Sequence, residues 1–278
     1  MNAVIKFNTG KKDRPKMIKL EFGKDCKDLS VSPSTLPIKE DEIPIPITIT
    51  CSGEFDKEQV LLVKADEKEC GKIRILPNGK QHQKEIKVVT ISVRTNLEAK
   101  KGEAKNGIIA TGGPDLFVNT LKQALITVPE GVESIEELDC TDEEFTNAYK
   151  KTYTNKKGEE CYGINSDTSW EMKGTLEQTL QKMYGHVYDE YYKLFFFADP
   201  CEGINGYAYY NTKHACFFDG HNASTVGHEV YHCFGLAHTF DFRDSKRCEI
   251  GYRYTKTNNM LDYSHHVGIE RNSLFYLQ

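Results

Sequence analysis

One stretch of the chain combines three histidines, a glutamate and a glycine at spacings that suit a catalytic metal. Residues 228–238 read HEVYHCFGLAH, which fits the pattern HExxHxxGxxH. On an α-helix His228 and His232 stand one turn apart on the same face, so both imidazoles can reach one zinc ion at about 2.0–2.1 Å. Gly235 tolerates the positive φ with which a helix ends sharply, and the turn returns His238 to the metal. The spacing predicts a three-histidine zinc site with an open fourth position.

Glu229 is the expected general base of this site. It is rotated about 100° from His228 around the helix, so it is not placed as a ligand. It can instead hydrogen-bond a water in the open position of the metal and take its proton. The shorter pattern HExxH also occurs by chance on amphipathic helices, but the added glycine and third histidine favour a metal site over a purely structural role. These residues predict hydrolysis by metal-activated water.

The complete motif resembles that of the metzincin zinc peptidases. Thr239 and Phe240, directly after His238, make it most similar to the pappalysin branch and related bacterial secreted peptidases. The resemblance is specific over residues 222–264 and extends in outline over 107–278. It implies a zinc-dependent endopeptidase in which Glu229 first takes the proton of the attacking water and then passes it to the leaving amine.

In metzincins a methionine-bearing turn lies under the metal, and a corresponding segment follows the motif. In the resembling relatives this turn reads Met-Asp-Tyr-Ser, whereas here Leu261 precedes Asp262 and Met260 sits one position early. The resemblance implies that either Leu261 or Met260 forms the apolar floor, an exchange that usually costs less than about 1.5 kcal/mol. Tyr263 stands where several metzincins place a tyrosine near the zinc or the oxyanion, and a tyrosine buried in the core is the alternative.

Six further residues could bind a metal ion, but none of them is assigned to the zinc site. Since three ligands are already present and catalysis needs an open position, four further histidines are not expected to be ligands: His214, His221, His265 and His266. Asp241 and Asp244 could help to hold a calcium ion in the lower loop, as in some relatives. The expected metals are therefore Zn²⁺ and, on two carboxylates alone, Ca²⁺.

The elements that must position these residues change in character near residue 105. From about 43 to 95, short β-rich runs are separated by turn signals such as Pro77-Asn78-Gly79, which predicts a small all-β sandwich domain over 1–104. Residues 105–278 are predicted to form an α+β metzincin-like catalytic domain with a mixed sheet and a loop-rich lower subdomain, and 97–113 reads as the linker. The expected helices of this catalytic domain lie within 115–126, 141–153, 176–192 and 222–234. Its expected strands lie within 193–198, 206–210 and 215–219.

The strand expected over 206–210 has a role of its own in the resembling family. There, the corresponding edge strand pairs with extended substrate, so that main-chain hydrogen bonds give affinity and side-chain pockets give selectivity. The sequence Gly-Tyr-Ala-Tyr-Tyr fits such a strand. Tyrosines that simply cover one face of the sheet are an equally weighted alternative.

Composition limits the partners and the location. A net charge of −5 argues against a nucleic-acid partner, and no apolar run approaches the roughly 20 residues that span a bilayer. The N-terminal residues lack the apolar core of a secretory signal. Because a broad peptidase would endanger its own cytosol, we expect a protein that is secreted or exported without a recognisable signal peptide and is cytoplasmic before export. The resembling bacterial domains include type VI effectors, which implies a secretion-machine partner or an immunity or inhibitor partner.

Several alternatives stay open. The nine cysteines fit either four disulfides with one free thiol, for which Cys233 is the candidate, or reduced structural cysteines. The substrate is expected to be a protein or peptide. A catalytically weak zinc-containing binding or adhesion protein is favoured by the shifted Met260 and disfavoured by the retained Glu229. A zinc amidase that acts on cell-wall peptides would use the same chemistry.

Overall fold

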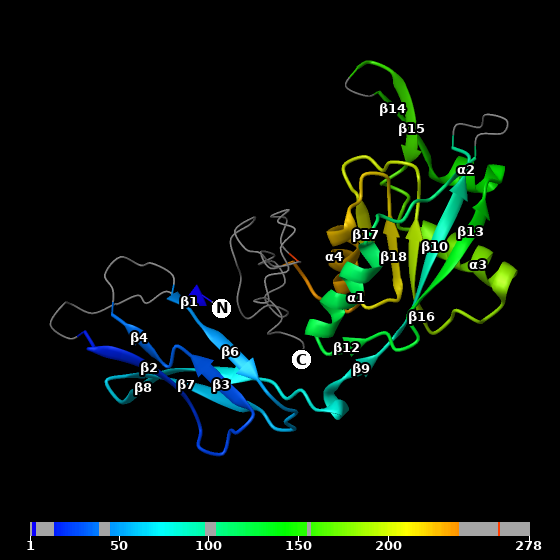
Figure 1. Cartoon of the computed structure of the whole chain (residues 1–278). Coiled ribbons are helices and arrows are strands. Elements are labelled where there is room, and N and C mark those ends of the chain that lie inside the picture. The colour runs from blue at the N-terminus through cyan, green and yellow to red at the C-terminus, as the bar shows by residue number, and fades with distance from the viewer. Residues whose placement is uncertain are drawn as a thin grey trace. The chain divides into compact units, whose positions relative to one another are not determined.

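The computed structural model describes residues 2–3, 14–38, 45–97, 104–154, 157–238 and 261. The chain divides into two compact units, and the division falls between Lys84 and Glu85. Each unit has its own sheets, and Figure 1 labels their elements. The secondary structure as a whole is mixed α/β with several sheets.

The described part of the first unit consists of antiparallel strands and one short 3₁₀ helix, η2 (Lys80–His82). A four-stranded sheet has the order β4 (Thr35–Pro37), β2 (Met17–Phe22), β7 (Gln59–Ala65) and β8 (Lys68–Ile75). Two strand pairs accompany it, β3 (Leu29–Ser32) with β6 (Thr48–Cys51), and β1 (Asn2–Ala3) with β5 (Ile45–Pro46). Buried residues alternate with more exposed ones along β2, where Ile18 and Leu20 enter the core with Leu36, Ile47 and Leu61.

The second unit is built on a six-stranded sheet. Its central strand β10 (Lys87–Thr95) pairs parallel with both β13 (Val132–Cys140) and β16 (Tyr191–Phe196). β16 pairs parallel with β18 (His214–Phe217), and β17 (Gly206–Ala208) is added antiparallel at the edge. The short β11 (Lys105–Asn106) pairs with the end of β10. All six residues of β16 are buried, as expected for a parallel strand that is covered on both faces.

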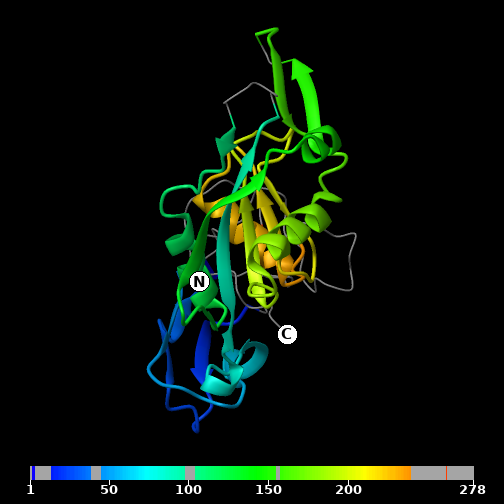
Figure 2. The same cartoon turned by 90° about the vertical axis from the view of Figure 1, so that its right-hand side faces the viewer.

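Helices cover the two faces of this sheet (Figure 2). On one face, α3 (Met172–Tyr184) buries Met172, Leu176 and Leu180 in the same core as Phe195 and Cys216 of the strands. On the other face, α4 (Ala223–Cys233) contacts β17, β18 and α1 (Gly113–Gln123), and the Tyr231 hydroxyl donates to Thr120 O at 3.0 Å. The remaining elements are α2 (Glu143–Tyr149), the hairpin of β14 (Lys150–Thr154) and β15 (Glu160–Ile164), and the pair of β9 (Lys84–Glu85) and β12 (Ile126–Thr127).

The division of the chain differs from the predicted one. We predicted a boundary between residues 104 and 105, with a linker over 97–113. In the structure the run at 87–95 is the centre of the second unit's sheet. The run KVVTISVRT alternates apolar and polar residues like a strand with one wet face, but residues 88–93 are all buried. The hydroxyls of Thr90 and Ser92 donate to Glu133 O and Gly107 O, so both faces of the strand can be covered.

Several predicted elements differ in extent. The helix expected over 141–153 ends at Tyr149, and the residues after it form β14. The helix expected over 176–192 begins earlier, at Met172, and ends at Tyr184 before Gly185, whose φ is +62°. The helix expected from about 222 to 234 is α4 at Ala223–Cys233. The predicted loop-rich lower subdomain lies outside the described residues apart from Leu261.

Candidate metal centre

The helix that carries the motif is fixed at its start by a capping box. Asn222 is the N-cap, and its side-chain oxygen accepts from the backbone N–H groups of Ser224 at 3.0 Å and Thr225 at 3.1 Å. The Thr225 hydroxyl in turn accepts from the backbone N–H of Asn222 at 3.3 Å. These bonds satisfy N–H groups that have no partner within the helix. From Val226 to Cys233 every residue of α4 is buried, so the helix is held rigidly against the sheet and α1.

The helix ends sharply at Gly235, as the spacing predicted. The N–H of Gly235 bonds to His232 O at 2.8 Å and that of Leu236 to Tyr231 O at 3.2 Å, which is a Schellman motif. Gly235 has φ +84°, and a Cβ at this position would lie 2.2 Å from Oδ1 of Asn211. Glycine is thus required both by the backbone conformation and by the space available, and the reversal brings His238 to the helix.

The structure brings His228, His232 and His238 together. Their Nε2 atoms form a nearly equilateral triangle, with 3.1 Å between His228 and His232, 3.1 Å between His232 and His238, and 3.2 Å between His228 and His238. A tetrahedral ion about 2.0–2.1 Å from three nitrogens needs separations of about 3.3 Å, so the triangle is close to the required size. His228 and His232 are 7% and 4% exposed.

The tautomer of His232 is fixed by its second nitrogen. Nδ1 of His232 lies 2.6 Å from Leu236 O, and because a carbonyl only accepts, Nδ1 carries the proton. The Nε2 lone pair therefore faces the other two imidazoles, which is how a metal-binding histidine is usually held. Burial is the largest cause, and the neighbouring His228 the second, of a pKa of His232 that is lowered to about 3. The ring is neutral at ordinary pH, the form that binds a metal ion.

Glu229 lies beside this triangle and is directed toward the edge strand. It is 7% exposed, and its Cγ would be 3.2 Å from a Cβ placed on Gly206, so the glycine leaves room for the carboxyl group. Burial raises the pKa of Glu229 to about 8, and a hydrogen bond from the backbone of Ala208 acts in the opposite direction. A divalent ion in the triangle would also favour the carboxylate.

Two residues at this site were not assigned to it by the sequence. The ring of Tyr210 lies 5.1 Å from that of His232, centroid to centroid, and the residue is 41% exposed. Asn211 has a positive φ of 57° and contacts the turn at Gly235. Asparagine tolerates this conformation better than most residues, which is the one local signal that the sequence offered. Tyr210 and Asn211 lie well before the motif in the chain, so the sequence alone does not show that they contact His232 and Gly235.

The other predicted site residues are placed as follows. Leu261 is buried at 8% exposure, whereas Met260 and Tyr263 lie outside the described residues, as do Asp241, Asp244, His265 and His266. His221 donates from Nδ1 to Phe218 O at 2.7 Å and accepts at Nε2 from the Ala110 N–H at 3.3 Å. It is therefore occupied in a structural role away from the triangle. The eight cysteines that the structure describes are free thiols, and the buried Cys233 donates to His214 O at 3.3 Å.

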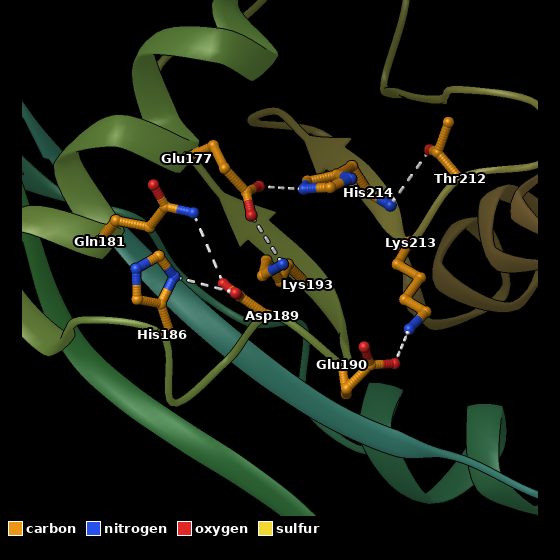
Figure 3. A network of polar contacts seen from close by, with 9 residues as sticks. All are labelled: Glu177, Gln181, His186, Asp189, Glu190, Lys193, Thr212, Lys213 and His214. Carbon is orange, nitrogen blue, oxygen red and sulfur yellow. Dashed lines mark hydrogen bonds and ion pairs between the residues drawn. The ribbon is translucent and has the colours of Figure 1, made fainter.

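A buried charged cluster links α3 to the strands of the sheet (Figure 3). The Lys193 ammonium, on a residue that is 1% exposed, lies 2.7 Å from Oε1 of Glu177, and His214 contacts the other carboxylate oxygen. Burial raises the pKa of Glu177, but the bonds from His214 and Lys193 outweigh it and hold this pKa at about 2. Burial lowers the pKa of His214, whose Nδ1 is buried with no hydrogen-bond partner among the described residues. A neutral His214 that donates from Nε2 to an ionised Glu177 agrees with the lowered pKa of both groups.

Comparisons with known proteins leave the family open. No protein-family model matches the chain, and no curated protein matches it. A solved structure described as "Structure of a chaperone-substrate complex" is similar over 69% of this chain and 28% of that chain, with 13% sequence identity and a TM-score of 0.32. That likeness is too weak to assign a fold or a function. Among the helices of the described residues, none is long and apolar enough to cross a membrane.

Proposed function

We propose that the protein is a zinc-dependent endopeptidase. The observation that carries the proposal is the triangle of three imidazole nitrogens, 3.1–3.2 Å apart, in which hydrogen bonding to Leu236 O directs the His232 lone pair inward. Three neutral nitrogen donors with an open fourth position are the ligand set of catalytic zinc, whereas structural zinc sites are closed by a fourth protein ligand. Glu229, next to the first ligand and buried, is available as the base.

The residues around the triangle support peptide hydrolysis specifically. A zinc ion bound there would lower the pKa of a water molecule and polarise a substrate carbonyl. Glu229 would take the proton from that water and deliver it to the leaving amine. β17 ends the sheet beside Glu229, and an extended polypeptide could add to it by main-chain hydrogen bonds. The partner is then a protein or peptide in extended form.

The test combines metal analysis with a peptidase assay. Zinc content and cleavage of denatured casein are measured for the wild type, Glu229→Gln and His238→Ala, with Glu136→Gln on the exposed surface of β13 as the matched control. We expect Glu229→Gln to retain zinc and lose turnover, because the ligands are intact but the base is gone. His238→Ala should lose both, and the control neither.

The outcomes separate the proposal from its rivals. Equal zinc and equal activity in all four proteins would contradict it. Zinc binding without cleavage of casein or a peptide library would favour a binding or adhesion protein. Cleavage of peptidoglycan fragments but not of proteins would favour the cell-wall amidase. Parallel incubation with both substrates therefore completes the assay.

A further inference from the structure

The edge strand β17 presents different chemistry on its two faces. A Cβ on Gly206 would point at Glu229, and Tyr210, just beyond the strand, lies against His232, so the even-numbered residues face the metal centre. Tyr207 lies 5.7 Å from Phe218 and 5.4 Å from Tyr209, centroid to centroid, on the opposite face, which α3 covers. The alternation is that of any β-strand. It gives β17 one metal face and one aromatic face.

The backbone of β17 leaves one side open for pairing. Asn205 O accepts from the Phe218 N–H at 2.9 Å, and the Tyr209 N–H donates to His214 O at 3.3 Å, so the odd-numbered residues bond to β18. In an antiparallel ladder the residues between them, Gly206 and Ala208, direct their backbone groups away from β18. On that side the backbone of Ala208 donates to the Glu229 carboxyl group, and no strand among the described residues pairs there.

An exposed tryptophan is fixed next to the aromatic face. Trp170, which is 56% exposed, lies 5.0 Å from Tyr207 and 5.9 Å from Tyr209 between ring centroids. The hydroxyl of Tyr207 donates to Ser169 O at 2.5 Å and that of Tyr209 to Trp170 O at 2.6 Å. The edge strand itself thus anchors the loop that carries the tryptophan. Because this loop is already anchored, a group that binds to Trp170 has little loop ordering to offset.

The charge beside this surface disfavours positively charged side chains. The Lys173 ammonium lies 5.6 Å from the centroid of the Tyr209 ring. One face of that ring is therefore already engaged with a cation, and a second cation would be repelled. An uncharged apolar or aromatic side chain meets no such penalty.

We propose that Trp170 and Tyr209, supported from beneath by the buried Tyr207, form a side-chain subsite, the tryptophan surface, for a large apolar or aromatic residue of a polypeptide strand added to β17. The inference rests on the proposed peptidase function and specifies its substrate. A substrate residue opposite Ala208 shares the metal face, so the residues immediately before and after it project onto the face of Tyr207 and Tyr209. Selection therefore acts one residue away from the position nearest Glu229.

The test uses the fact that Trp170 is the one tryptophan of the chain. Zinc-loaded Glu229→Gln is titrated with peptides that differ only in carrying Phe, Leu, Ala or Lys at one central position, and the wild type is assayed for cleavage of the same peptides. We expect a blue shift of tryptophan emission with Phe and Leu and little with Ala or Lys. In cleavage assays Trp170→Ala should lower kcat/KM for the Phe and Leu peptides about tenfold through KM, and leave the Ala peptide unchanged.

Two variants serve as controls. Trp170→Phe should restore most of the preference, because an aromatic ring is retained, and Tyr184→Ala, at an exposed aromatic residue at the other end of α3, should not alter it. If Trp170→Ala cleaves the peptides with an unchanged preference, and the tryptophan emission of Glu229→Gln does not shift when peptide is added, the subsite is overturned. The proposed peptidase function then stands. An emission shift on peptide binding without any cleavage by the wild type would overturn the peptidase and retain the subsite. If the wild type cleaves no peptide and no emission shift occurs, both the peptidase function and the subsite are overturned.

Discussion

Two of the three proposed ligands are placed by a regular helix, and the third depends on a single glycine. His228 and His232 would keep their spacing in any helix over this segment, since they are one turn apart. His238 reaches them only through the turn at Gly235, where φ is +84° and the side chain of Asn211 fills the space in which a Cβ would lie. The geometry of the third ligand is therefore the most sensitive to substitution.

At the residue scale we predict that Gly235→Ala weakens zinc binding about tenfold and destabilises the protein by about 1–2 kcal/mol. The alanine is strained at positive φ, and the displaced turn moves His238. Zinc competition titration and urea unfolding measure the two effects. Gly174→Ala is the matched control, because Gly174 lies in α3 and a Cβ there has nothing within 4 Å. That variant should be neutral or slightly more stable, as expected for glycine to alanine in a helix. Equal zinc affinity in both variants would contradict the assigned role of the turn.

At the scale of elements, the cluster of Glu177, Lys193 and His214 ties α3 to β16 and β18. Lys193 is opposite His214 in the register of the two strands, so one carboxylate from the helix reaches both. The turn that precedes His214 carries Tyr210 and Asn211 to the candidate metal centre. The stability of this cluster therefore contributes to the order of the site as well as to that of the core.

The cluster predicts a specific acid sensitivity. The pKa of Glu177 is about 2 in the folded protein against an ordinary value of 4.5, so its contribution is complete above about 4.5 and is lost as the pH falls toward 2. The loss is on the order of 2–3 kcal/mol. His214 also has a lowered pKa, and its contribution, complete above its ordinary value of 6.5, declines as the pH falls below that value.

Urea unfolding as a function of pH checks this prediction. Glu177→Gln should lower stability at neutral pH and flatten the decline between about pH 4.5 and pH 2, because no carboxylate remains to be protonated. His214→Gln should flatten the decline that begins just below pH 6.5. Glu136→Gln, exposed on β13, should keep the wild-type profile. A profile of Glu177→Gln that runs parallel to the wild type would refute the role of the cluster.

At the scale of the whole molecule, the placement of β10 decides where the second unit begins. β10 pairs on both sides, with β13 and with β16, and its residues Val88, Val89, Ile91 and Val93 are fully buried. A fragment that omits this strand would expose the facing edges of both neighbours and the apolar residues that pack on it.

We therefore predict that a fragment beginning at Lys84 folds and binds zinc, whereas one beginning at residue 105 does not fold. The first retains β9 and β10, and the second lacks the central strand. Circular dichroism, a cooperative thermal transition and zinc content distinguish them. A soluble, cooperatively unfolding fragment from residue 105 would contradict the central position of β10. Failure of the fragment from Lys84 alone would show that the first unit is needed for folding.

The sequence by itself determined the local features of the segment that carries the histidine motif. The capping residue Asn222, the one-turn spacing of His228 and His232, and the glycine at the helix end are each encoded within a few neighbouring residues, and α4 agrees with them to within one residue at each end. Periodicity also located the strands that follow α3, because their apolar runs are short and bounded by turns.

Only the tertiary structure decided which segments meet. The assignment of β10 to the second unit, the edge position of β17, the approach of Tyr210 to His232 and the contact of Trp170 with Tyr209 all join residues far apart in the chain. Strand pairing follows from burial of whole faces and satisfaction of backbone groups across the sheet, and no single segment carries that information. The side chains proposed to carry the chemistry therefore lie within eleven consecutive residues, whereas the surface proposed to select the substrate appeared only when the sheet was assembled.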